Sequence, residues 1–139
     1  MVKKLHARAH LIQGFQIALD NGRSHCVVVD EPPDVGTDLG PTPLELCVMS
    51  HAGCYVVTCI WIAKKMRIPL KGLEVKVEAV ESEETDTVSE EAFDITVKAD
   101  ASMDRIQRLH ELTLKDCSVG KIFEQAGVRL SYNIKASKA

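Results

Sequence analysis

The stretch LELCVMSHAGCYVVTC, from Leu44 to Cys59, holds the side chains of this chain that are best suited to chemistry. It contains three of the five cysteines and one histidine in a mostly apolar run. At a helical period of 3.6 residues, Cys47, His51 and Cys54 fall on one face, at i, i+4 and i+7. Thiols in such a setting serve as apolar filler, metal ligands or redox groups.

A purely structural role is the first interpretation. Free cysteine is often a small buried apolar residue, and this is our expectation for Cys26 and Cys59. His51 is expected to be a hydrogen-bonded histidine of the core.

A metal site is the second interpretation. Cys47, His51 and Cys54 would supply three soft ligands, and Cys117 would supply a fourth. Structural zinc sites more often use two cysteines separated by two residues, so the spacing in this chain is unusual for zinc.

Thiol redox chemistry is the third interpretation. A thiolate attacks a peroxide and becomes a sulfenic acid, which condenses with a second thiol to a disulfide. Cys47 and Cys54 cannot form that disulfide, because seven residues of helix rise about 10 Å and the Cα atoms of a disulfide lie within about 7 Å. A partner for Cys54 must therefore lie on another element, and Cys117 is a natural candidate.

Length and composition limit the classes of protein to which this chain can belong. The 139 residues predict a single domain spanning 1–139. A net charge of −3 and only six aromatic residues argue against nucleic-acid binding. The basic start MVKKLHARAH is not followed by an apolar segment of the kind that signal peptides contain. We therefore expect a cytoplasmic location, and the odd number of cysteines is not typical of a secreted disulfide framework.

The segment Leu46 to Ala63 carries no charged residue and is near the lower limit of length for a membrane span. Ser50, His51 and Thr58 interrupt its apolar character. Amphipathic strands on both sides also need an apolar element on which to pack. We therefore expect a buried central helix and no membrane contact.

The N-terminal segment is expected to form strands. Residues 5–12 are weakly strand-like, and residues 15–19 alternate between apolar and polar side chains. Asn21 and Gly22 then precede the apolar run 26–29. Asn-Gly between two such runs predicts a hairpin, because both turn residues must tolerate a positive φ.

The central helix has a clear start signal in the sequence. A loop rich in Pro, Gly and Asp covers residues 30–41. Thr42 is placed as the N-cap, Pro43 at the first helical position and Glu45 at N3, which completes a capping box. The helix is expected to run to about Met66.

The remaining chain is expected to begin with a strand over 73–78, an acidic solvated turn over 81–91 and a second strand over 93–97. Two helices over 103–112 and 116–127 should follow, with Gly127 as the final C-terminal cap, and then a last strand over 128–132. This order predicts an α+β fold in which an antiparallel sheet packs on the long central helix.

Five short motifs give the chain a specific family resemblance. Three lie at the central helix: a Gly-x-x-Pro helix start (Gly40 to Pro43), a Glu-Leu step (Glu45-Leu46) and a small-residue run ending in cysteine (Ala52-Gly53-Cys54). The other two are an alternating strand that begins with glycine (Gly72 to Val77) and a late cysteine that opens a helix (Cys117-Ser118-Val119). Together they resemble the OsmC/Ohr family of hydroperoxide-reducing proteins, over about residues 14–134.

The resemblance implies an OsmC/Ohr-like fold assembled as an intertwined homodimer, with active sites at the subunit interface. It implies a thiol-dependent peroxidase of the oxidative stress response that reduces organic hydroperoxides to alcohols, with H2O2 as a further candidate substrate. An external dithiol would reduce the enzyme's disulfide, and no bound cofactor would be required. The other interpretation of the same fold is a non-catalytic binding protein or a stress protein that binds metal through Cys47, His51 and Cys54.

By the same resemblance, Cys54 is the attacking cysteine and Cys117 the resolving one. A reactive cysteine needs a lowered pKa. Cys117 is expected near a helix N-terminus, whose dipole favours the thiolate, whereas Cys54 in the middle of a helix would have no such help. Cys54 is therefore expected to need a nearby cation, for which Arg23 is our hypothesis, while His51 would serve as a base or hydrogen-bond partner.

Arg23, just after the Asn-Gly turn, is the best match for the family's catalytic arginine, and Arg8 is a weaker one. Glu45 resembles the carboxylate that holds that arginine. The chain departs from the family here, because the family's glutamate lies ten residues before the cysteine, where this chain has Leu44. A capping-box role is the other interpretation of Glu45.

Overall fold

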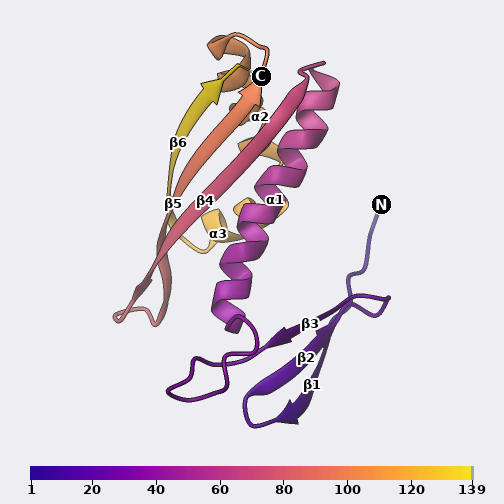
Figure 1. Ribbon diagram of the computed structural model, residues 1–139, viewed down its shortest axis with the longest axis vertical. Coiled ribbons are helices and arrows are strands. Elements are labelled where there is room, and N and C mark those ends of the chain that lie inside the picture. Colours follow the sequence, from indigo (N-terminus) through magenta and orange to yellow (C-terminus); the bar gives the residue numbers. More distant parts are fainter. Residues whose placement is uncertain (139) are drawn as a thin grey trace. The chain divides into compact units, whose positions relative to one another are not determined.

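The computed structural model describes residues 1–138 and divides into two compact units, residues 1–47 and residues 48 onward (Figure 1). Each unit has its own three-stranded sheet. The α+β class predicted from the sequence is confirmed, with three helices and six strands in the described chain. The assignment of the whole chain to a single domain stays a prediction.

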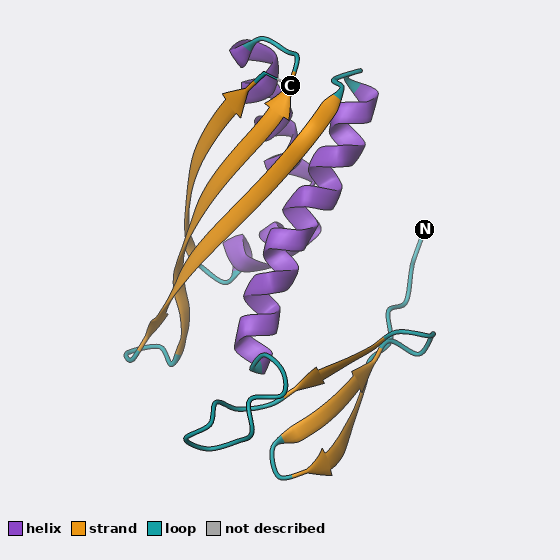
Figure 2. Ribbon diagram, in the orientation of Figure 1, coloured by secondary structure: helices purple, strands orange, loops and turns teal. Residues whose placement is uncertain are grey.

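The first unit contains an antiparallel sheet with the order β1-β2-β3 (Figure 2). Its strands are β1 (Arg8–Gln13), β2 (Gln16–Asp20) and β3 (Cys26–Val29). The predicted hairpin joins β2 and β3, but only Gly22 adopts a positive φ, of 76°. The turn is therefore longer than a two-residue Asn-Gly turn.

Hydrogen bonds to the carboxylate of Asp30 organise the loop that follows β3. The carboxylate of Asp30 accepts the hydroxyl hydrogen of Thr37 at 2.6 Å and the backbone N–H of Leu39 at 3.1 Å. The hydrogen bond from Thr37 is the main cause that lowers the pKa of Asp30 to about 2. The loop is thus folded on itself before the central helix begins.

Helix α1 (Pro43–Lys65) begins at the predicted capping box. Glu45 N–H donates to the Thr42 hydroxyl at 3.1 Å, and Thr42 N–H donates to the Glu45 carboxylate at 2.9 Å. By length and composition α1 would suffice to cross a membrane, a test that core helices of soluble proteins also pass. Its buried residues pack into the core of the second unit: His51, Tyr55, Cys59, Ile62 and Ala63.

The second sheet is built from β4 (Leu70–Ser82), β5 (Thr87–Ala99) and β6 (Arg129–Ser137), in that order. The expectation of an acidic turn over 81–91 is wrong, because the turn covers only residues 83–86. β5 alternates strictly between buried and exposed residues over 91–99. Glu91 begins the buried face of β5.

Two helices connect β5 to β6: α2 (Met103–Asp116) and α3 (Ser118–Gln125). The Ser102 hydroxyl caps α2, and Gly127, with a φ of 80°, ends α3 as predicted. Because this crossover returns the chain to the end of the sheet where β5 began, β6 pairs parallel to β5. The prediction of a wholly antiparallel sheet is therefore wrong for the last strand.

The core of the second unit lies where α1, α2 and β5 pack together (Figure 1). Cys59 is 1% exposed and belongs to this core, so its predicted role as filler is confirmed. Burial also raises the pKa of the Cys59 thiol. Cys26 is exposed on β3, the edge strand of the first sheet, so the prediction that it is buried is wrong.

Candidate functional site

Cys54 and Cys117 meet although they are distant in the sequence. Cys54 lies in α1 and is half-buried, whereas Cys117 lies at the junction of α2 and α3 and is only 2% exposed. Both are free thiols, and their side chains are joined by a hydrogen bond. The structure thus brings together the two cysteines that the sequence analysis paired.

The thiol of Cys54 is surrounded by hydrogen-bond donors. Burial by itself raises its pKa, but the backbone N–H of Val119, the side chains of Cys117 and Thr58, and the N–H of Ser118 more than offset this and lower the pKa below its usual value. Ser118 and Val119 form the first turn of α3, whose N-terminal end favours a negative charge. The expectation that Cys54 has no help from a helix N-terminus is therefore wrong.

The thiol of Cys117 has a raised pKa, in contrast to that of Cys54. Burial raises the pKa of its thiol to about 11, and the adjacent Cys54 contributes in the same direction. The expectation that a helix N-terminus would make Cys117 the more acidic thiol is wrong, because desolvation outweighs the dipole. Of the two cysteines, Cys54 is the more acidic thiol, and Cys117 is a hydrogen-bond donor to it.

This asymmetry predicts the pH dependence of alkylation. Since only the thiolate reacts with iodoacetamide, Cys54 should react at a lower pH than an ordinary cysteine, and Cys117 should react only as the pH approaches about 11. Peptide mass mapping after brief alkylation at a series of pH values measures both profiles, and exposed Cys26 serves as the internal reference. Equal profiles for Cys54 and Cys26 would contradict the assignment.

A buried, hydrogen-bonded pair of side chains, His51 and Glu91, lies next to the cysteines. His51 Nδ1 and a carboxylate oxygen of Glu91 are 2.8 Å apart, and the side chains are 2% and 0% exposed. The imidazole ring stacks on Phe123 at 4.7 Å and meets the edge of Phe93 at 4.6 Å between ring centroids. The prediction of a hydrogen-bonded core histidine is confirmed, and Glu91 is a site residue that the sequence analysis missed.

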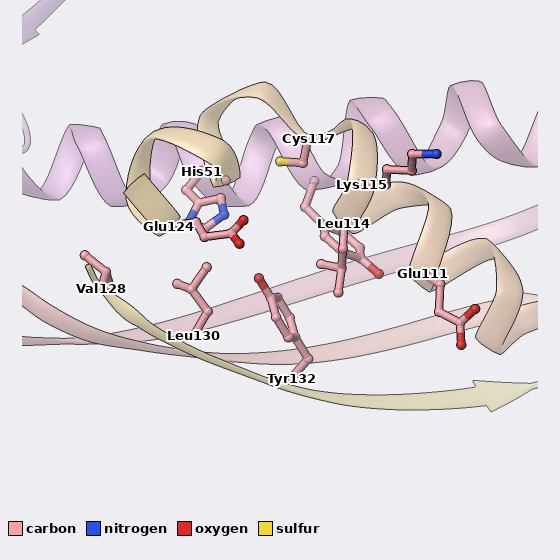
Figure 3. Close-up of a pocket in the computed structure, with 11 residues that line it drawn as sticks. His51, Glu111, Leu114, Lys115, Cys117, Glu124, Val128, Leu130 and Tyr132 are labelled. Carbon is pink, nitrogen blue, oxygen red and sulfur yellow. The ribbon is translucent and has the colours of Figure 1, made fainter. Parts of the chain in front are cut away.

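A cavity of about 500 Å³ opens beside this couple (Figure 3). Cys117, rather than Cys54, forms part of its wall together with His51. Apolar and aromatic side chains supply much of the remaining lining: Tyr55, Leu114, Val128, Leu130 and Tyr132. Three acidic or basic side chains complete this part of the wall: Glu111, Lys115 and Glu124. Burial raises the pKa of Tyr132 to about 12, so its phenol stays protonated at neutral pH.

The structure does not join the other predicted site residues into one group. Glu45 closes the capping box, and Arg8 forms an ion pair with Asp20 at 2.9 Å. Arg23 is exposed in the loop between β2 and β3, and among residues 1–138 no ion pair links it to Glu45. The roles of Arg23 and Glu45 toward Cys54 stay predictions.

The proposed metal ligands do not share an environment. Cys47 is exposed, His51 is buried and bonded to Glu91, and Cys54 contacts Cys117. Within the described part of the chain, no group of three or more His, Cys, Asp or Glu side chains is arranged to hold a metal ion. The geometry therefore does not support the metal interpretation.

Comparisons with known proteins identify the family of the chain. A family model described as OsmC-like protein matches residues 36–133. No curated protein matches the chain. Among solved structures, an OsmC-like protein from Mycoplasma pneumoniae has a TM-score of 0.84 at 17% identity, covering 100% of this chain and 99% of that one.

Two further solved structures carry functional names. An organic hydroperoxide resistance protein OsmC from Legionella pneumophila has a TM-score of 0.69 at 13% identity, covering 99% of this chain and 98% of that one. The organic hydroperoxide resistance protein OhrB of Bacillus subtilis has a TM-score of 0.64 at 18% identity, covering 96% and 98%. At these identities the structures establish the fold, and the family model establishes the relationship: this chain belongs to the OsmC/Ohr family.

Proposed function

We propose that this protein is a thiol-dependent peroxidase that reduces organic hydroperoxides to alcohols. The observation that carries the proposal is the contact between Cys54 and Cys117, in which hydrogen bonds favour the thiolate of one cysteine and burial keeps the other a thiol. This is the arrangement that an attacking and a resolving cysteine require. The names of two structural relatives point to the same substrate class.

The reaction runs in three steps. The Cys54 thiolate attacks the terminal oxygen of the hydroperoxide, the O–O bond breaks, and the alcohol leaves with a proton while Cys54 becomes a sulfenic acid. The Cys117 sulfur then attacks the Cys54 sulfur, and the sulfenic oxygen leaves as water, so that a disulfide forms. An external dithiol reduces this disulfide by two successive exchanges and is itself oxidised.

The local environment suits an apolar substrate. The cavity beside Cys117 offers an aromatic and aliphatic wall of Tyr55, Leu130 and Tyr132, on which the carbon chain of a hydroperoxide or of a dithiol can pack. H2O2 has no apolar part and would gain nothing from this wall. Because Cys54 contacts Cys117, a substrate bound at Cys54 can extend its carbon chain toward this cavity, and we therefore infer a preference for organic hydroperoxides.

An exposed stripe on α1 supports the expected homodimer. Met49, Val57, Ile60 and Trp61 lie close to one helix face, and each is at least 40% exposed. Such a large apolar surface is typical of a protein contact, and a second copy of this chain is its proposed occupant.

Arg23 and Glu45 enter the proposal as the resemblance implies, Arg23 as a cation for the Cys54 thiolate and Glu45 as its carboxylate partner. A cytoplasmic setting would keep the resting thiols reduced.

The test is peptide mass mapping after one equivalent of cumene hydroperoxide, added anaerobically and quenched with acid. We expect a disulfide between Cys54 and Cys117 to form within seconds and to disappear on addition of dithiothreitol. Cys59 and Cys26 should remain reduced and provide the internal controls. Thiols that all stay reduced in a folded protein would reject the peroxidase function and favour a binding role for the fold.

A further inference from the structure

The proposed chemistry requires a proton to leave and return to Cys117. Its thiol must lose that proton when it attacks the Cys54 sulfenic acid, and it must regain one when the disulfide is reduced. Cys117 is 2% exposed, and burial raises its pKa to about 11. Bulk water at neutral pH is a poor proton acceptor for such a thiol, so a base close to the sulfur would speed both steps.

His51 of α1 and Cys117 lie close together at the first turn of α3. A Cβ added at Gly120 would lie 3.1 Å from His51 Nε2 and 3.3 Å from Cys117 Sγ. Both atoms therefore converge on the position where only a glycine leaves space. Figure 3 shows the Cys117 sulfur pointing toward the His51 side of the cavity.

Glu91 fixes the orientation of that histidine. Its carboxylate accepts the Nδ1 hydrogen of His51, so Nε2 is the nitrogen that is left to accept a proton. Phe93 and Phe123 hold the plane of the ring. The second oxygen of Glu91 is buried without a hydrogen-bond partner among the described residues, so His51 is the group on which this carboxylate acts.

We propose that His51 is the proton acceptor and donor for Cys117, and that Glu91 is the residue that positions it. As the Cys117 sulfur bonds to the Cys54 sulfur, its proton passes to His51 Nε2, the S–O bond of the sulfenic acid breaks, and the departing hydroxide takes a proton from solvent and leaves as water. During reduction, the imidazolium returns a proton to Cys117 as the S–S bond to that sulfur breaks. No oxidant or reductant is needed beyond those of the proposed function, on which this inference rests.

The surroundings of His51 are compatible with a proton relay. The cavity reaches both His51 and Cys117, which gives the relay access to solvent for exchange of its proton. The titratable and charged groups that line the cavity with His51 or bond to it come from several elements: Tyr55 of α1, Glu91 of β5, Glu111 and Lys115 of α2, Cys117 at the junction of α2 and α3, Glu124 of α3 and Tyr132 of β6. Glu91 is hydrogen-bonded to the imidazole through Nδ1.

The test separates the resolving step from the first step. His51→Gln keeps an amide donor for Glu91 but cannot accept a proton, and Glu91→Gln keeps the volume and removes the charge. After a pulse of cumene hydroperoxide, dimedone traps the Cys54 sulfenic acid and mass spectrometry follows its conversion to the disulfide. We expect unchanged sulfenic acid formation and a resolving step about 100-fold slower in His51→Gln. In that variant the rate should keep rising with pH toward about 11, where the thiol itself ionises.

The matched control is His110→Gln. His110 is also a buried, hydrogen-bonded histidine, paired with Tyr55 at 2.6 Å, but it is not among the residues that line the cavity beside His51 and Cys117. This control should resolve the sulfenic acid at the wild-type rate even if its stability falls. Resolution at the wild-type rate and pH profile in both His51→Gln and Glu91→Gln would overturn the proposal.

A second assay makes the inference independent of peroxide chemistry. A Cys54–Cys117 disulfide formed with diamide is reduced by dithiothreitol, and loss of the disulfide is followed at neutral pH. We expect reduction to be about 100-fold slower in His51→Gln than in the wild type and His110→Gln. If the wild type forms no sulfenic acid but shows this difference, the peroxidase function fails and the relay stands. Equal rates of reduction in all three proteins would reject the relay.

Discussion

Replacement of Cys54 by serine is expected to reduce hydroperoxide consumption to the rate of the uncatalysed reaction. A serine hydroxyl is not ionised at neutral pH, and the four donors around position 54 would have no thiolate to stabilise. Loss of cumene hydroperoxide, followed in the presence of dithiothreitol, measures the effect. Because the oxygen is almost isosteric with sulfur and Cys54 is only half-buried, the variant should remain folded.

Two control variants make this result specific. Cys26→Ser, at an exposed position in the other unit, should retain full activity. In the absence of a thiol reductant, Cys117→Ser should consume one equivalent of hydroperoxide and stop at the sulfenic acid, because no second thiol condenses with it. Full activity in Cys54→Ser would remove the basis of the proposed mechanism.

Replacement of His51 by leucine is expected to destabilise the protein by about 3–5 kcal/mol, because it leaves the Glu91 carboxylate buried without a partner. Equilibrium unfolding in urea, monitored by circular dichroism, measures the loss. The double variant His51→Leu/Glu91→Leu should recover most of the lost stability, since apolar residues of similar volume can replace a buried polar pair at little cost.

One result for the double variant would contradict this explanation of the lost stability. A double variant as unstable as His51→Leu would mean that the loss arises from packing against Phe93 and Phe123 rather than from the unpaired carboxylate. The prediction therefore distinguishes an electrostatic role of the pair from a steric one. It concerns stability alone and is independent of the proposed activity.

Local signals in the sequence predict the start of the central helix well. Thr42 and Glu45 bond to each other through groups three residues apart, so the capping box depends on nothing outside the segment. The alternation over β4 and β5 is likewise local. The direction of β6 is different, because its alternating side chains are the same in a parallel and an antiparallel pair.

The candidate site was predictable only in part. The positions of Cys54 and Cys117 come from the family resemblance, but their relative acidities depend on the burial of Cys117 and on the N–H groups of Ser118 and Val119. Glu91 was hidden at the end of an acidic run that suggests a solvated turn. A signal was present nevertheless, because Glu91 is in phase with the buried residues Phe93, Ile95 and Val97.

The parallel pairing of β5 with β6 has a consequence for how the protein acquires its chemistry during folding. A parallel neighbour can join the sheet only after the intervening chain has made its crossover, and such non-local contacts form slowly because loop closure must be offset first. Cys117 lies inside that crossover. A chain in which the crossover has not yet packed would lack the donors Cys117, Ser118 and Val119 beside Cys54, and therefore both the acidic thiol and its partner.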